Sequence, residues 1–153
     1  MAEEKQIKEE KIEKKESRKK VITVSGKRKM AVAKATIKDG TGIVKVNKKP
    51  IETFSFFRKL ALLEPLRLAE EILKEKSKTF DISVIMSGGG VESQIDAARL
   101  AIARAIMAFT KSPELRSAYI HYDRYLLVAD VRRKEMRKPG DSKARAKRQK
   151  SYR

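Results

Sequence analysis

Cysteine and tryptophan are absent from this chain of 153 residues, and His121 is its single histidine. Without cysteine the chain can form neither a disulfide framework nor a thiolate metal site, and one histidine excludes a multi-histidine metal cage. No apolar run approaches the roughly 20 residues that a membrane-spanning helix needs. The first twenty residues contain no apolar signal core. These absences predict a soluble intracellular protein that uses no metal, no cofactor and no membrane.

Positive charge is what the sequence has in excess. Lys and Arg number 38 against 20 Asp and Glu, a formal net charge of +18. Such an imbalance opposes compaction unless a polyanion neutralises it. The excess is concentrated at one end, because residues 130–153 hold 11 basic and 3 acidic side chains, and the last eleven residues, "KARAKRQKSYR", hold six basic ones. This pattern predicts a C-terminal tail that binds nucleic acid.

The chain divides into three parts. Residues 1–20 mix Glu and Lys with little apolar surface, and we expect them to be mostly disordered. Residues 21–130 have the periodicity of one globular domain, and residues 131–153 form the basic tail. Within the domain we expect a β-hairpin over 21–47 with a turn at "DGTG", a strand over 80–86 and a last strand over 125–130. The order of elements predicts an α+β fold in which helices pack on a four-stranded sheet.

Three helical regions are expected between these strands. Residues 55–76 read as two helices, the second opening at Pro65, which suits a first helical position. Apolar residues at helical spacing, from Ile95 to Phe109, predict a long helix after the glycines. Ser112 followed by Pro113 predicts the cap and first residue of another helix.

The segment "SGGGVES" follows an expected strand and precedes an expected helix. That setting is shared with phosphate-binding loops, but the lysine and hydroxyl pair of a mononucleotide loop is missing. Three interpretations remain: a tight turn that needs positive φ, a contact of Gly88, Gly89 and Gly90 with RNA phosphate, or a mononucleotide site. The first needs only the conformational freedom of glycine.

A few other side chains have both a structural and a functional interpretation. His121, two residues from Asp123, is either a structural histidine or a general base, and no motif marks a nucleophile for it. Arg99 and Arg104 are either solvated or in contact with phosphate. Tyr152 lies far from any expected core and is either simply exposed or stacked on a base.

The stretch "GGGVESQIDAARLAIARAI", from Gly88 to Ile106, resembles the signature of the small-subunit ribosomal protein nine family. The stretches "SGKRKMAVAKATIKDGTGIVKVN" and "HYDRYLLVAD" fit the same family, and the ending "QKSYR" is similar to its archaeal and eukaryotic branch. The resemblance covers about residues 21–153. It implies a fold like the second domain of ribosomal protein five, with a left-handed βαβ crossover.

The resemblance also implies partners and sites. The chain would be a non-enzymatic, cytoplasmic constituent of the small-subunit head, bound to small-subunit ribosomal RNA and neighbouring head proteins, with no small-molecule substrate. Its ribosomal RNA contacts would be Lys27, Arg28, Lys29, Gly88, Gly89, Gly90, Arg99, Arg104, Arg132, Arg133, Lys138, Lys143, Arg145, Lys147 and Arg148. Its tail tip, Lys150, Ser151, Tyr152 and Arg153, would contact transfer RNA in the peptidyl site.

Two other classes fit part of the sequence. A DNA-binding or chromatin protein shares the composition, but it does not explain the glycine–helix signature. An enzyme remains conceivable because small-molecule kinases share the fold family and use a glycine-rich loop at this place. No catalytic constellation supports that alternative, and likeness of fold alone is weak evidence of activity.

Overall fold

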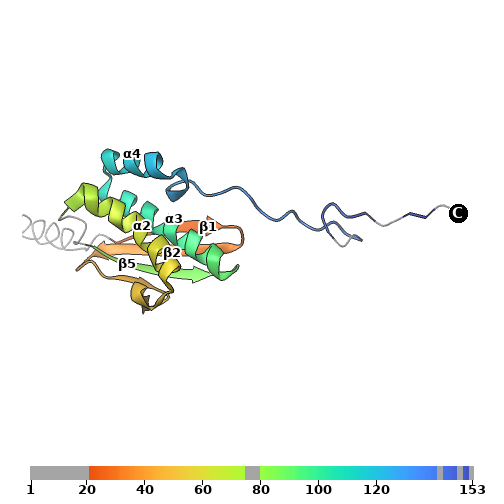
Figure 1. Ribbon diagram of the computed structural model, residues 1–153, viewed down its shortest axis with the longest axis horizontal. Helices are drawn as coiled ribbons and strands as arrows, with labels where there is room; N and C mark the ends of the chain where they lie inside the picture. Colours follow the sequence, from red (N-terminus) through yellow and green to blue (C-terminus); the bar gives the residue numbers. More distant parts are fainter. Residues whose placement is uncertain (1–20, 75–79, 141–142, 148–149, 152–153) are drawn as a thin grey trace, which may run out of the picture.

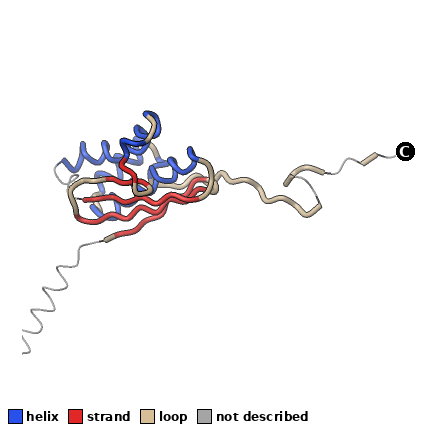
Figure 2. The backbone as a smooth tube through the Cα atoms, turned by 90° about the horizontal axis from the view of Figure 1, so that it is seen from below, coloured by secondary structure: helices blue, strands red, loops and turns tan. Residues whose placement is uncertain are grey.

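The computed structural model describes residues 21–74, 80–140, 143–147 and 150–151. A mixed five-stranded sheet forms one layer, and the helices pack together on one side of it (Figures 1 and 2). The prediction of an α+β fold is therefore confirmed. The Glu/Lys extension predicted over residues 1–20 lies outside the described residues.

The sheet runs in the order β1-β2-β5-β3-β4. Strands β1 (Ile22–Arg28) and β2 (Ala31–Asp39) form an antiparallel hairpin, and β5 (Phe80–Ser87) pairs antiparallel along β2. The short β3 (Val44–Val46) pairs parallel to β5, and β4 (Lys49–Pro50) forms the edge.

Two predictions about the sheet were wrong. It has five strands among the described residues rather than four. The "DGTG" turn does not join two paired strands, because β5 lies between β2 and β3. The Asp81 carboxylate, on β5, instead accepts hydrogen bonds from the backbone N–H groups of Thr41 (2.8 Å) and Ile43 (3.0 Å). Contacts between segments some 40 residues apart thus replaced the strand pairing that local turn chemistry had suggested.

The parallel pairing of β3 with β5 makes the segment between them a crossover connection. It contains the 3-10 turn η1 (Ile51–Thr53) and helix α2 (Phe56–Leu73). The left-handed sense of this crossover, and the likeness to ribosomal protein five, stay predictions.

Helix α2 is one continuous helix, so the expectation of two pieces divided at Pro65 was wrong. Proline inside a helix removes a hydrogen bond and crowds the preceding turn. Here tertiary packing offsets that cost. Pro65 is buried beside Leu62 and Ala69 on one face of α2, and its carbonyl accepts a 2.7 Å hydrogen bond from the buried Tyr119 hydroxyl.

The long helix α3 (Val91–Thr110) lies close to the sheet because both surfaces carry small residues. The contact face of α3 is rich in buried alanine, including Ala97 and Ala101, and β2 presents Ala31, Ala33 and Ala35 to the same core. Gly26 on β1 permits the closest approach, since a Cβ there would stand 2.2 Å from the Ala97 carbonyl oxygen. None of the described helices is long and apolar enough to span a bilayer.

Helix α4 (Pro113–Tyr122) begins as predicted, with the Ser112 hydroxyl accepting from the Leu115 N–H. The prediction of a strand over 125–130 was wrong, because η3 (Arg124–Leu126) occupies part of this segment as a 3-10 turn. The Asp123 carboxylate accepts from the Tyr125 N–H at 2.8 Å and starts this turn. Burial of Leu126 then anchors the chain without any pairing to the sheet.

Residues 21–130 alone should melt in one cooperative thermal transition. The buried core ends with Leu126, and residues 131–140 are exposed throughout. The fragment keeps every buried apolar contact of the described core, so it should remain two-state. The measurement is thermal unfolding of the fragment and of the full chain, both followed by circular dichroism. A broad, non-cooperative melt would show that the tail contributes to the core.

Candidate nucleic-acid interface

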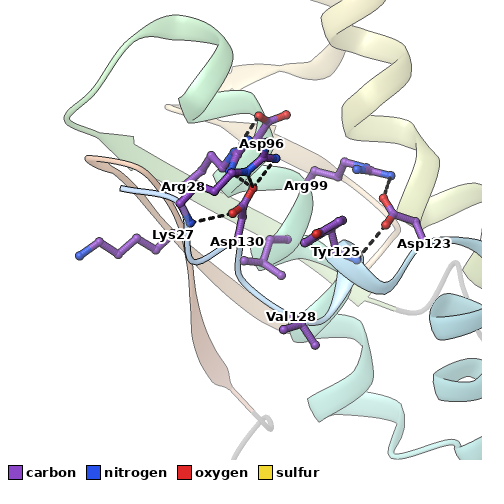
Figure 3. Close-up of a pocket in the computed structure, with 10 residues that line it drawn as sticks. Lys27, Arg28, Asp96, Arg99, Asp123, Tyr125, Val128 and Asp130 are labelled. Atoms are coloured by element: carbon purple, nitrogen blue, oxygen red, sulfur yellow. Dashed lines mark hydrogen bonds and ion pairs between the residues drawn. The ribbon is translucent and has the colours of Figure 1, made fainter. Parts of the chain in front are cut away.

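A cluster of charged side chains stands where the tail leaves the domain (Figure 3). Arg28, the last residue of β1, ion-pairs with Asp130 and lies 3.5 Å from the carboxylate of Asp96 on α3. Arg132 donates to Asp130 from its backbone N–H (2.8 Å) and from its guanidinium (2.7 and 2.9 Å). The hydrogen bonds from Arg132 hold the pKa of the Asp130 carboxyl far below its usual value. The start of the tail is thus tied to β1.

A small polar cavity of about 160 Å³ opens beside this cluster. It is lined by residues of both signs: Lys27, Arg28, Asp96, Arg99, Leu100, Asp123, Tyr125, Val128, Asp130 and Arg132. Its carboxylates are already paired with arginines. No group of three His, Cys, Asp or Glu in the described part of the chain could hold a metal ion. His121 is exposed in the last turn of α4, outside the cavity lining.

Arg99, a candidate phosphate ligand from the sequence, sits between two carboxylates. Its guanidinium ion-pairs with Glu64 of α2 and, at 2.8 Å, with Asp123 after α4. Burial lowers the pKa of Arg99, but the hydrogen bonds and charges of Glu64 and Asp123 together outweigh it, so the pKa is raised. The side chain therefore joins three helical elements of the domain.

Arg104 is also engaged within the domain. Its Nε donates to the Leu127 carbonyl at 2.8 Å, and a terminal nitrogen donates to the Ser25 carbonyl at 3.0 Å. These bonds link α3 to β1 and to the segment that follows η3. Neither Arg99 nor Arg104 is simply solvated, which was the structural alternative for both.

The glycine loop is a tight turn, as the first interpretation held. Gly88 and Gly89 have φ of 71° and 63°, in the region that favours glycine. A Cβ on Gly88 would lie 2.8 Å from the Met30 carbonyl oxygen, so the loop packs against the β1–β2 turn. Gly90 differs, since a Cβ there would meet nothing within 4 Å. Contact of this loop with RNA phosphate stays a prediction.

The remaining candidate RNA-binding residues are mostly exposed lysines and arginines. Lys27 is the next-to-last residue of β1. Lys29 follows the strand and has a φ of 52° in the turn. In the tail, Arg133, Lys138, Lys143, Lys147 and Lys150 are exposed. Arg145 makes a bidentate pair with Glu135, with its Nε 2.9 Å from one oxygen and a terminal nitrogen 2.5 Å from the other. Arg148, Tyr152 and Arg153 lie outside the described residues.

Sequence reasoning missed three exposed lysines that share one face of the sheet: Lys34, Lys38 and Lys45. The signal was present in the alternation of "AVAKATIKD", which places Lys34 and Lys38 opposite the buried alanines. It was not read as a site because two pairings between distant segments, β2 with β5 and β5 with β3, are needed to bring Lys45 beside the other two lysines.

The excess of basic side chains, many of them exposed, favours a polyanion-binding protein. Comparison with known proteins identifies the family to which this chain belongs. The family described as "Ribosomal protein S9/S16" matches residues 26–153. Three similar proteins, each named small ribosomal subunit protein uS9, come from Methanococcus maripaludis, Thermoplasma volcanium and Methanothrix thermoacetophila, at 46%, 47% and 44% identity. The matches cover 88%, 86% and 88% of this chain and 99%, 98% and 99% of those relatives.

The chain therefore belongs to the S9/S16 family of ribosomal proteins. The family resemblance inferred from Gly88 to Ile106 is confirmed, and so is the prediction that the chain is not an enzyme, because this family is one of ribosomal structural proteins.

Proposed function

We propose that this chain is a structural constituent of the small ribosomal subunit head, in the cytoplasm, and that it binds small-subunit ribosomal RNA and neighbouring head proteins. The observation that carries the proposal is the family match over residues 26–153, which includes the whole basic tail. The charge of +18 supports it, since a polyanion offsets the repulsion of so many cations. The function requires no cofactor, membrane or small-molecule substrate.

The side chains predicted to bind RNA differ in how accessible they are to phosphate. The exposed lysines, such as Lys27, Lys29 and Lys143, are open to phosphate. Arg132 is exposed but its partner Asp130 is nearly buried. Arg145 and its partner Glu135 are both exposed, and exposed ion pairs contribute little stability. RNA phosphate competes readily with such pairs. Arg28, Arg99 and Arg104 are more enclosed, and their first role is to hold the domain together.

The finer part of the proposal concerns the tip of the tail. Lys150, Ser151, Tyr152 and Arg153 contact transfer RNA in the peptidyl site. Fifteen extended residues span about 50 Å, enough for a tail to leave a domain held in RNA and reach a distant ligand. Six cations in the last eleven residues offset the repulsion of a path lined with phosphates. The tail need not fold by itself, because RNA orders it on binding.

Deleting residues 150–153 should weaken transfer RNA binding in the peptidyl site by about tenfold or more, with assembly near normal. The deletion removes two cations and one ring, and charge-assisted bonds contribute about 1.5–3 kcal/mol each before screening by salt. Ribosomal RNA contacts are spread over many other cations and should compensate. The measurement is transfer RNA affinity on purified small subunits, beside the amount of this protein in them.

Two matched variants separate charge from stacking at the tip. Lys150→Gln with Arg153→Gln keeps the ring, and Tyr152→Ala keeps both cations. The first should account for most of the loss if phosphate contacts dominate. Full occupancy with unchanged transfer RNA affinity in the deletion variant would show that the tip does not touch transfer RNA.

A further inference from the structure

The sheet has one face that no described helix covers. The described helices pack on the other side, as Figure 2 shows with helices in blue and strands in red. Burial along the strands agrees, since β2 and β5 alternate between fully buried residues and exposed or half-buried ones. Gly26, Ala33 and Val84 belong to the helix-covered face, so their strand neighbours belong to the open face.

Strand register brings basic and hydroxyl side chains together on this open face. Ser25 pairs with Lys34, which pairs with Ile85, while Thr36 pairs with Ser83 and Ser83 with Lys45. Its lysines are Lys27, Lys34, Lys38 and Lys45, and its hydroxyls are Thr23, Ser25, Thr36, Ser83 and Ser87. The strands lie about 4.8 Å apart and rise about 3.3 Å per residue, so Lys34 and Lys38 are roughly 13 Å apart along β2.

Most of the positive charge of the open face is not neutralised by carboxylates within the described part of the domain. No ion pair joins these four lysines to a carboxylate in the described residues, whereas Arg28, Arg58 and Arg99 all pair with carboxylates on the helical side. Among the described strand residues, Asp81 is the one acidic residue on the open face, and it pairs with Lys38 in the register. Backbone N–H groups of Ile43 and Thr41 occupy its carboxylate and, with a smaller effect of Lys38, lower its pKa.

We propose that this open face binds the sugar-phosphate backbone of double-helical RNA. Double-helical RNA presents a wide, shallow minor groove with 2′-hydroxyls and flanking phosphates, and proteins recognise it mostly by shape. Short Ser and Thr hydroxyls suit the 2′-hydroxyls, and the longer lysines reach the phosphates on either side. Single-stranded RNA fits poorly, because stacking requires aromatic rings and the face has none. Val32 and Ile85 provide the apolar area between the cations.

This inference rests on the proposed ribosomal RNA binding and assigns it a surface separate from the tail. In the full chain, Lys34→Gln, Lys38→Gln and Lys45→Gln together should lower affinity for a 20-base-pair RNA duplex by about tenfold near 0.1 M salt. Three lost phosphate contacts should also flatten the slope of log K against log salt by about 2.7, at about 0.9 per contact with a duplex. All three lysines are exposed, so the thermal transition should be unchanged.

A control variant removes the same charge elsewhere: Lys111→Gln, Arg116→Gln and Arg124→Gln, all exposed around α4. It should bind the duplex nearly as the wild-type chain does. Equal losses in the two variants would mean that net charge alone matters and would overturn the proposal. The three substitutions on the sheet should reduce affinity most for the RNA duplex. They should reduce it less for a DNA duplex of the same sequence and for a single-stranded RNA.

Lysine labelling within purified small subunits tests the face directly. Lys34, Lys38 and Lys45 should be protected from acetylation in the subunit and become reactive after ribonuclease digestion. Free reactivity of all three in the intact subunit would overturn the proposal, and so would protection that survives ribonuclease, which indicates a protein on this face. Absence of the chain from small subunits would instead contradict the proposed function itself.

Discussion

Replacing Gly26 with valine should destabilise the domain by about 3 kcal/mol or more. Even the Cβ would stand 2.2 Å from the Ala97 carbonyl oxygen and 2.7 Å from the Ala101 backbone nitrogen. Both atoms belong to the backbone of α3, so no side chain can rotate away. The helix must move off β1, and the movement loosens the alanine-lined contact along its length. Urea unfolding of the full chain, followed by circular dichroism, measures the change.

Two variants give this prediction a graded control. Gly26→Ala adds the Cβ alone and should have a smaller but clear effect. Gly90→Ala should change the free energy of unfolding by no more than about 0.5 kcal/mol, because Gly90 is a helix cap with a φ of −100° and open space around it. Unfolding midpoints for Gly26→Val and Gly90→Ala that agree within error would contradict the close approach of β1 and α3.

Removing residues 137–153 should make RNA binding much less dependent on salt. The segment contains eight basic side chains, and if about half meet phosphates they contribute about −3 to the slope of log K against log salt. Between about 50 and about 200 mM salt, a slope of −3 corresponds to roughly a 60-fold fall in affinity. The measurement is a titration of small-subunit ribosomal RNA with full and shortened chains at four or more salt concentrations.

A tail with its eight basic residues replaced by glutamine keeps the length and removes the charge. It should behave like the deletion, because counterion release depends on charge and not on chain length. An unchanged slope after deletion would place the phosphate contacts on the domain instead. The lysines of the open sheet face then become the first candidates.

Local chemistry predicted several elements correctly. The Ser112–Pro113 pair starts α4, the glycines form a turn of positive φ, and apolar spacing gave α3. Each of these depends on residues within about one turn of one another. The family could be inferred for the same reason, since its signature is a continuous stretch from Gly88 to Ile106.

Elements that depend on distant partners were predicted poorly. Pro65 read as a helix start, but burial and the bond from Tyr119, 54 residues away, keep α2 continuous. "YLLVAD" read as a strand, yet Asp123 and the burial of Leu126 make it a turn and an anchor. In both segments burial against distant parts of the chain outweighed the local propensity.

The sequence by itself determined the class of this protein: its charge, its basic tail, its freedom from thiolate metal sites and its family all follow from residues counted or read in order. Only the tertiary structure decided which cations are free. Arg28, Arg99 and Arg104 read as phosphate ligands, but each meets carboxylates or carbonyls supplied by other elements. Lys34, Lys38 and Lys45 carried no motif, and strand register gathers them on one open face. The physical reason is that a side chain's charge is local, whereas its neutralisation depends on what folding brings beside it.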